Sequence, residues 1–266
     1  MTNTATRNDR DVEPGQRHGK KPRKKQAIEH DMEHGIQRVV ALGDIVTVWA
    51  HPDDESYLAA GVMAIARANG ARVTCVTATD GELADSEQER RVIARRRRRE
   101  LDAALDVLGV TDRVRLGLRD GGCAAVDPKG PVAMIASVIA ERSPDTIVTF
   151  GPDGLTGHPD HCAVSRWTAE AARRAGSGAR LLNTAATADI MDEHEDVNSR
   201  FEVFEPGFPT LHRRDELSVD LALDGRWLDL KLRALQAHAS QTAGLIDVLG
   251  IDRYRRWIVP EMFVDA

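Results

Sequence analysis

Residues 51–55 bring together several side chains that can bind a metal ion or transfer a proton. They read His-Pro-Asp-Asp-Glu and directly follow the apolar run 45–49. Crowded carboxylates repel one another and are costly to bury, and a bound cation relieves both penalties. His51 and Asp54 can reach one metal ion, which leaves Asp53 beside it as a candidate base. At the start of a helix, these acids would also interact favourably with the helix dipole.

A pair of imidazoles stands further along the chain. His158 and His161 are three positions apart near the expected start of a helix, where Pro159 suits the first turn. That spacing can place both rings on one side of the helix. A pair of histidines on its own is more often found at the surface. Two polar clusters that follow equivalent strands, however, indicate a shared ligand.

The combined donors favour zinc. Two neutral imidazoles and one carboxylate, with one position open for water, form a catalytic zinc arrangement. Water bound to zinc in such a site has a pKa of about 7. Asp53 would accept its proton, and the histidine that does not bind metal would stabilise the oxyanion and protonate the leaving group. The spacing leaves open which histidine that is, and iron and manganese remain alternatives. The residues therefore predict metal-assisted hydrolysis, with an amide as the expected substrate.

The elements that must position these residues alternate between strands and helices. Apolar and β-branched runs predict strands over 45–49, 72–78, 114–116 and 146–150. Helical periodicity predicts helices over 55–68, 86–108 and 131–142, and another from about 159 to 175. This alternation predicts an α/β fold: a Rossmann-like, mostly parallel sheet with helices on both faces, in a single domain. Such sheets bind ligands outside the carboxyl ends of their strands, where the polar clusters lie.

The pattern is weaker after residue 181. There we expect strands over 200–205 and 217–223 and helices over 226–239 and 245–256. His194 and His212 lie in this part, and we expect both at the surface.

Composition indicates a cytoplasmic, globular protein. The chain has 266 residues, of which 42% are hydrophobic, enough for one sizeable domain over 41–266. Residues 1–40 are polar, with a basic cluster at 20–25, and we expect a disordered tail there. The net charge of -6 gives no general case for nucleic-acid binding. Apolar runs long enough for a membrane span and a secretion signal are both missing. The three distant cysteines fit a reducing compartment.

Two short motifs resemble a known family. Residues 50–55 (Ala-His-Pro-Asp-Asp-Glu) and 157–161 (Gly-His-Pro-Asp-His) look like the paired signature of the PIG-L/LmbE-type N-acetylglucosaminyl deacetylases. The resemblance covers about residues 44–250 and includes 79–82, 97–109 and 231–241. It implies a Rossmann-like fold and a single zinc ion. It also implies removal of acetyl groups from N-acetylglucosamine moieties in glycolipids, mycothiol and bacillithiol precursors, chitooligosaccharides and glycopeptide antibiotics.

The resemblance also implies roles for single residues. It makes Asp53 the general base, and His158 the oxyanion stabiliser and general acid, with Asp160 orienting or tuning His158. The implied zinc ligands are His51, Asp54 and His161.

Arg97 and Asp120 match family positions that bind substrate. Arg97 lies in the arginine run 95–99 but falls on the inward, apolar stripe of its helix, so it needs a partner. A structural ion pair, with Asp120 or Glu82, is the alternative role for Arg97. The alternative for Asp120 is a turn aspartate.

Three further residues bear on the site. Thr156 stands where some sugar deacetylases of this family carry a tyrosine, which weakens an assignment to the mycothiol pathway in particular. We expect His238 to support the site or to pack, without direct catalysis. Gln241 is a candidate to support the site.

The predicted protein is a zinc-dependent hydrolase, an N-deacetylase that removes an acetyl or other acyl group from an amino sugar or small glycoconjugate. The alternative within enzymes is an amidase that acts on a larger thiol- or sugar-conjugate amide. A nucleotide-binding oxidoreductase would need a Gly-x-Gly-x-x-Gly turn where residues 51–55 stand. A nucleic-acid-binding protein would use the basic tail and the arginine run, which lacks interleaved aromatics. We expect a small-molecule substrate and neither nucleic acid nor membrane as a partner. A homo-oligomer is left open.

Overall fold

A seven-stranded sheet forms the centre of the protein, in the order β3-β2-β1-β4-β5-β9-β8. The computed structural model describes Met1 and residues 32–266. Five strands are parallel: β1 (Ile45–Trp49), β2 (Val73–Thr79), β3 (Asp112–Leu118), β4 (Thr146–Thr149) and β5 (Arg180–Thr184). β9 (Pro260–Asp265) runs antiparallel to its two neighbours, β5 and β8 (Val219–Ala222). A separate two-stranded ribbon pairs β6 (Ala186–Thr187) with β7 (Leu211–His212).

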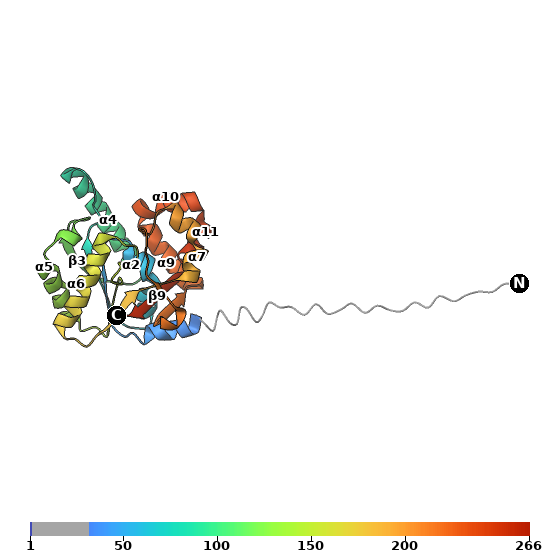
Figure 1. The fold of residues 1–266 in the computed structure, drawn as a ribbon, viewed down its shortest axis with the longest axis horizontal. Helices are drawn as coiled ribbons and strands as arrows, with labels where there is room; N and C mark the ends of the chain where they lie inside the picture. The colour runs from blue at the N-terminus through green and yellow to red at the C-terminus, as the bar shows by residue number, and fades with distance from the viewer. Residues whose placement is uncertain (2–31) are drawn as a thin grey trace.

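Helices cover both faces of this sheet. On one side α9 (Gly225–Ala237) packs against α3 (Ala60–Ala68) and α4 (Glu87–Val107). On the other side α5 (Lys129–Arg142) packs against α6 (Pro159–Ala175). In Figure 1, α5 and α6 lie at the left of the molecule and α9 lies at the right. The predicted Rossmann-like, mostly parallel fold in a single domain is therefore confirmed.

The order of the strands creates a crevice between β1 and β4. The chain moves outward from β1 to β2 and β3, then returns to place β4 on the other side of β1. Loops that leave two such strands diverge to opposite faces, and ligands bind in the crevice between them. The loop after β1 carries residues 51–55, and the loop after β4 carries residues 157–161.

The strand that leads into the crevice, β1, is apolar because it is buried. All five residues of β1 are buried, as expected for a central parallel strand covered on both faces. The rings of Trp49 and Phe150 meet edge to face at 5.1 Å, at the ends of β1 and β4. This packing holds the starts of the two loops at a fixed separation.

Two predicted helices are each divided in the structure. The expected helix 55–68 is interrupted at Ala59, which separates α2 (Asp54–Leu58) from α3. The expected helix 245–256 is interrupted at Gly250, whose φ of +73° ends α10 (Ala239–Leu249) before α11 (Ile251–Trp257). Left-handed backbone of this kind is easily adopted by glycine, so Gly250 marks the break.

The expected strand over 200–205 is wrong. α7 (Ala188–Glu193) and α8 (Glu195–Arg200) come first, and irregular chain follows. Val203 and Phe204, which lie in the predicted range, line a pocket. The sequence reading also missed β5 and β9.

The disordered tail over residues 1–40 stays a prediction. Most of it, residues 2–31, lies outside the described residues. Residues 32–40 form a helix whose Val39 is fully buried in the core. Among the described residues, none of the helices is both long and apolar enough to cross a membrane.

Candidate metal centre and active site

Three side chains converge in the crevice. His51 Nδ1 lies 3.2 Å from His161 Nε2, and Asp54 Oδ2 lies 3.6 Å from His51 Nδ1. The other carboxylate oxygen of Asp54, Oδ1, lies 3.4 Å from His161 Nε2. Ligand atoms bound tetrahedrally to one zinc ion at about 2.0–2.1 Å stand roughly 3.3–3.4 Å apart. The two imidazole nitrogens therefore have the separation of two ligands of a single ion, and Asp54 reaches each of them through a different carboxylate oxygen.

His161 presents its Nε2 lone pair to this cluster. Its Nδ1 lies 3.1 Å from the carbonyl oxygen of Gly154 and 3.1 Å from Thr156 Oγ1. A carbonyl oxygen only accepts, so Nδ1 carries the proton and Nε2 is free to bind metal. The turn that supplies this carbonyl needs glycine: Gly154 has φ +70°, and a Cβ there would stand 2.8 Å from the Cβ of His161.

Two aspartates orient His51. Its Nε2 lies 3.0 Å from Asp120 Oδ1 and 3.4 Å from Asp160 Oδ2, so Nδ1 faces the cluster. Asp160 is itself fixed by the backbone N–H groups of Gly121 and Cys123. Burial lowers the pKa of His51, but hydrogen bonds to these carboxylates outweigh burial and raise the pKa to about 10. The position therefore strongly favours positive charge, as a cation site should.

These contacts bear on two sequence predictions. Asp120 was expected to bind substrate and Asp160 to orient His158. The structure places both carboxylates against His51, and Asp160 meets His158 through its backbone N–H, which donates to His158 Nδ1 at 3.1 Å. Substrate contact by Asp120 remains a prediction.

His158 stands beside the cluster as the N-cap of α6. Its ring centre is 4.9 Å from those of His51 and His161. Because Nδ1 accepts the N–H of Asp160, the neutral ring carries its proton on Nε2. His158 can therefore donate a hydrogen bond from Nε2. One ring nitrogen from each of His51, His158 and His161 lies within 4.8 Å of the others, so these three side chains could also hold a metal ion.

Asp53 occupies a strained position at the start of α2. Its φ of 119° is rare for a residue other than glycine, and its N–H donates to Glu55 Oε2 at 2.9 Å. Burial raises the pKa of Asp53, with Asp54 and Glu55 adding to the effect and Arg97 opposing it, to about 7. A cation bound at Asp54 would lower this pKa again.

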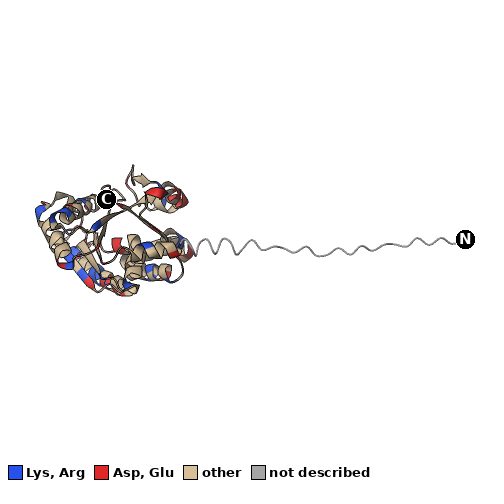
Figure 2. Ribbon diagram, turned by 90° about the horizontal axis from the view of Figure 1, so that it is seen from below, with Lys and Arg blue, Asp and Glu red and all other residues tan. Residues whose placement is uncertain are grey.

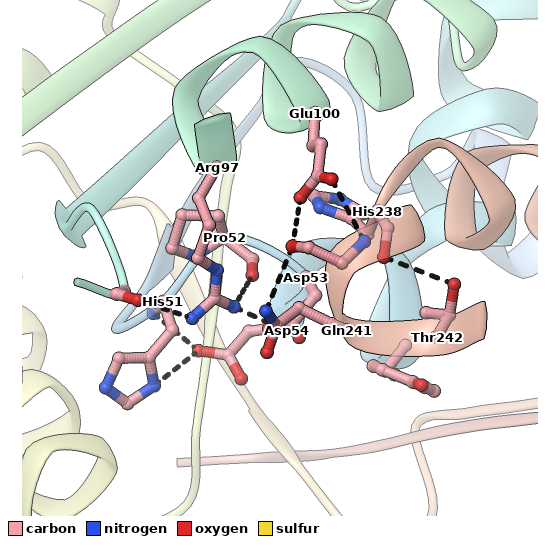
Figure 3. Close-up of polar contacts among 12 residues, drawn as sticks. His51, Pro52, Asp53, Asp54, Arg97, Glu100, His238, Gln241 and Thr242 are labelled. Atoms are coloured by element: carbon pink, nitrogen blue, oxygen red, sulfur yellow. Dashed lines mark hydrogen bonds and ion pairs between the residues drawn. The ribbon is translucent and has the colours of Figure 1, made fainter. Parts of the chain in front are cut away.

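Arg97 holds Asp53 in place. The side chain is buried, and its Nη2 lies 3.2 Å from Asp53 Oδ2 and 2.5 Å from the carbonyl oxygen of Pro52. Its Nη1 donates to the carbonyl oxygen of Gly81 at 2.9 Å. Figure 3 shows Arg97 reaching from α4 to the loop that carries these residues. The structural alternative named Asp120 or Glu82 as the partner, whereas the observed partner is Asp53. Substrate contact by Arg97 remains a prediction.

The sequence reading missed the partnership of Glu55 with His238. Both side chains are fully buried, and His238 Nε2 lies 2.8 Å from Glu55 Oε1. Burial lowers the pKa of His238, but Glu55 outweighs it and the pKa is raised. Burial likewise raises the pKa of Glu55, but His238 outweighs it and the pKa is lowered. Each partner therefore favours the charged form of the other, and Glu55 also accepts the N–H of Asp53. The sequence predicted that His238 supports the site or packs, but it did not identify Glu55 as its partner.

A pocket of about 390 Å³ opens from this cluster. Asp53, Asp54 and His161 form one end, and Gln241 also lines it. His194 lines the wall and is 4% exposed, so the expected surface position is wrong. Its ring packs beside Arg253, whose Nη1 lies 3.2 Å from His194 Nδ1. His212 is partly exposed, with Nδ1 3.7 Å from Glu216 Oε2.

Comparison with known proteins places the chain in a family. Residues 46–172 match the family model PIG-L, described as GlcNAc-PI de-N-acetylase. Over 239 residues the chain is 34% identical to the 1D-myo-inositol 2-acetamido-2-deoxy-alpha-D-glucopyranoside deacetylase of Rhodococcus jostii (strain RHA1). That alignment covers 74% of this chain and 81% of the relative. The chain belongs to the PIG-L family.

Solved structures share the fold at lower sequence identity. The A40926 pseudoaglycone deacetylase Dbv21 superposes with a TM-score of 0.60 at 21% identity, over 84% of this chain and 97% of that one. The N,N'-diacetylchitobiose deacetylase of Pyrococcus horikoshii gives a TM-score of 0.59 at 17% identity, over 94% and 93% of the two chains.

Proposed function

We propose that this protein is a zinc-dependent N-deacetylase that removes an acetyl or related acyl group from an amino sugar or a small glycoconjugate. The observation that carries the proposal is the convergence of His51, Asp54 and His161 beside the carboxylate of Asp53. The Rhodococcus jostii relative is named for deacetylation of a 2-acetamido sugar, which supports a substrate of that class.

His51, Asp54 and His161 would hold one zinc ion per chain, because two imidazole nitrogens and one carboxylate converge in the crevice and form a donor set that suits zinc. The bound ion supplies a Lewis acid and a water molecule that ionises near neutral pH. Asp120 and Asp160 keep the imidazole of His51 turned toward the ion.

Asp53 is the base in this proposal. Arg97 holds Oδ2, and the backbone of Asp53 is fixed through Glu55, so the carboxylate is oriented before substrate arrives. It accepts the proton of the attacking water. Pre-orientation of this kind lowers the entropic cost of the reaction.

His158 acts on the other side of the amide. Its Nε2–H donates to the carbonyl oxygen as negative charge develops there. When the C–N bond breaks, His158 gives its Nε2 proton to the departing amine, and the proton that Asp53 took from the water replaces it. The N–H of Asp160 fixes the ring by donating to Nδ1. Thr156 does not take the place of a tyrosine in this step, because its hydroxyl lies against His161.

A larger amide substrate remains the second candidate. The pocket beside His161 is larger than an acetyl group requires, which favours this alternative.

The arginine run gives no support for nucleic-acid binding. Several of its members pair with acids, such as Arg96 with Glu100 and Arg98 with Asp80. Figure 2 shows acidic and basic residues side by side on the helices.

We place the reaction in the cytoplasm, since the three cysteines are free.

The test compares Asp53→Asn with His161→Ala, measuring zinc content and release of amine from N-acetylglucosamine substrates. Asp53→Asn should lose turnover by about 10²–10⁴-fold, the usual contribution of a general base, and keep its zinc. His161→Ala should lose both. Turnover retained in Asp53→Asn, or full zinc content in His161→Ala, would contradict the proposal.

A further inference from the structure

The pocket beside the metal cluster extends well beyond the reacting groups. It begins at Asp53, Asp54 and His161, and it continues between α2, α7, α10 and α11 toward the start of β9. Its volume of about 390 Å³ lies within the range of roughly 300–1,000 Å³ that is typical of small-molecule sites. A pocket of this size can hold part of a substrate.

The walls of this extension are largely apolar. The side chains come from α2, the segment 190–204, α10 and α11, so the surface is assembled from elements far apart in sequence. They include Leu58, Ile190, Met191, Phe204, Leu245 and Trp257. A cavity of about 150 Å³ with such a lining can hold a benzene ring, and this one is larger.

Several polar groups in the walls are already hydrogen-bonded within the protein. Tyr57 Oη lies 3.0 Å from Tyr254 Oη, and Asn198 Oδ1 accepts the indole N–H of Trp257 at 3.0 Å. Sugar hydroxyls buried here would find few free partners, and burying them unpaired is costly. An apolar group has no such cost.

Glu261, the acid in the wall, is also fully engaged. Lys231 Nζ lies 3.0 Å from its Oε1, and both side chains are fully buried. The carboxylate also accepts the backbone N–H groups of Gly61 and Val62, at the start of α3. Glu261 therefore stabilises the helix and its lysine partner, and it offers little to a ligand.

We infer that the substrate carries an apolar group, an alkyl chain or an aromatic ring, attached close to the scissile amide and buried in this pocket. The inference rests on the proposed deacetylase function and specifies its substrate class. The apolar group belongs either to the acyl side of the amide or to the aglycone of the amino sugar. Both have the same chemistry in the pocket, and a substrate series separates them.

The first experiment measures kcat/KM for two series with the zinc-loaded enzyme. One series contains N-acyl glucosamines from acetyl to octanoyl, and the other contains N-acetylglucosamine glycosides from methyl to octyl, with phenyl. Each buried methylene is expected to raise kcat/KM about fourfold until the pocket is filled. The series that rises identifies the side that carries the group.

The outcomes are distinguishable from failure of the proposed function. Release of amine from unsubstituted N-acetylglucosamine, with no gain in either series, would overturn the inference and leave the deacetylase proposal standing. No amine from any member of either series would contradict the proposed function itself.

Variants on α10 provide a matched test. Leu245→Asn makes the wall polar and should lower kcat/KM for the preferred long substrate by at least tenfold more than for the acetyl or methyl member. Val248→Asn makes the same kind of change outside the lining, at a side chain that is 49% exposed, and should leave both values unchanged. Equal losses for long and short substrates in Leu245→Asn would count against the inference.

Tryptophan fluorescence tests binding without turnover, and it also serves if Leu245→Asn fails to fold. Hexyl glucosaminide, an amine product, should change the emission of the wild-type protein through Trp257, whereas free glucosamine at the same concentration should not. The change should be absent in Trp257→Phe. An identical response to both amines would overturn the inference.

Discussion

His238 lies 2.8 Å from Glu55 across 183 residues of sequence, with both side chains completely buried. The other oxygen of the same carboxylate accepts the N–H of Asp53 at 2.9 Å. Through Glu55, His238 therefore holds the backbone of the candidate base in its strained conformation. His238 positions the site without touching the reacting atoms.

Removal of His238 should destabilise the protein strongly. His238→Leu leaves Glu55 as an unpaired buried charge, for which a loss of about 3–5 kcal/mol in the free energy of unfolding is expected. Chemical denaturation measures it. His212→Leu, at a partly exposed histidine, is the control and should change stability little. The double variant Glu55→Gln with His238→Leu should recover part of the loss, and a merely additive result would refute the coupling.

Zinc should stabilise the folded protein directly. A ligand that binds only the native state at 100 times its Kd adds about 2.7 kcal/mol to the free energy of unfolding. We expect a gain of that size for the wild-type protein when zinc is added after treatment with a chelator. Asp54→Ala should show a much smaller gain, because it lacks one of the three converging donors. Equal gains in the two proteins, followed by thermal or chemical denaturation, would argue against this ligand set.

Gly81→Ala should disturb the site through Arg97. Gly81 has φ +63°, and a Cβ there would stand 2.0 Å from Arg97 Nη1. The matched control is Gly176→Ala, which has φ +60° and no neighbour within 4 Å. The control should cost only the backbone penalty of about 1–2 kcal/mol. Gly81→Ala should cost more and should also lower kcat, because Arg97 must leave Asp53. Comparable stability and kcat in the two variants would show that Arg97 can move aside freely.

Acid should weaken the end of the sheet where β5 meets β9. Hydrogen bonds from Arg180 lower the pKa of Asp265 to about 2, and Ser218 adds to the effect. A carboxyl group with a lowered folded-state pKa stabilises the fold above its unfolded pKa of about 3.9, and the stabilisation is lost as the pH falls toward 2. Both side chains are well exposed, so we expect only about 0.2–1 kcal/mol.

Urea denaturation of Asp265→Asn at pH 5 and at pH 2.5 measures this contribution. The variant should be less stable than the wild type at pH 5, and the difference should shrink at pH 2.5. In an Arg180→Gln background the substitution should have a smaller effect at pH 5. A difference that grows at the lower pH would contradict the sign of the prediction.

Much of the fold follows from local pattern. Buried parallel strands appear in a sequence as continuous apolar runs, so β1 was predicted at its observed bounds, 45–49. The helix predicted over 86–108 is observed as α4, and Ser86 caps it by accepting the N–H of Glu89. The strands β5 and β9 were not recognised, since their pairing depends on partners distant in the chain.

The candidate site, like the fold, could be predicted only in part from the sequence. The sequence by itself determined which side chains could bind metal, because their types and their place after two strands are local properties. Only the tertiary structure decided that Asp120 and Asp160 orient His51, that Arg97 holds Asp53, and that His238 pairs with Glu55. These contacts join residues from different helices and loops. The physical reason is that the spacing of residues within a helix or strand indicates only which face of that element is buried. It does not indicate which residue from a distant part of the chain packs against that face.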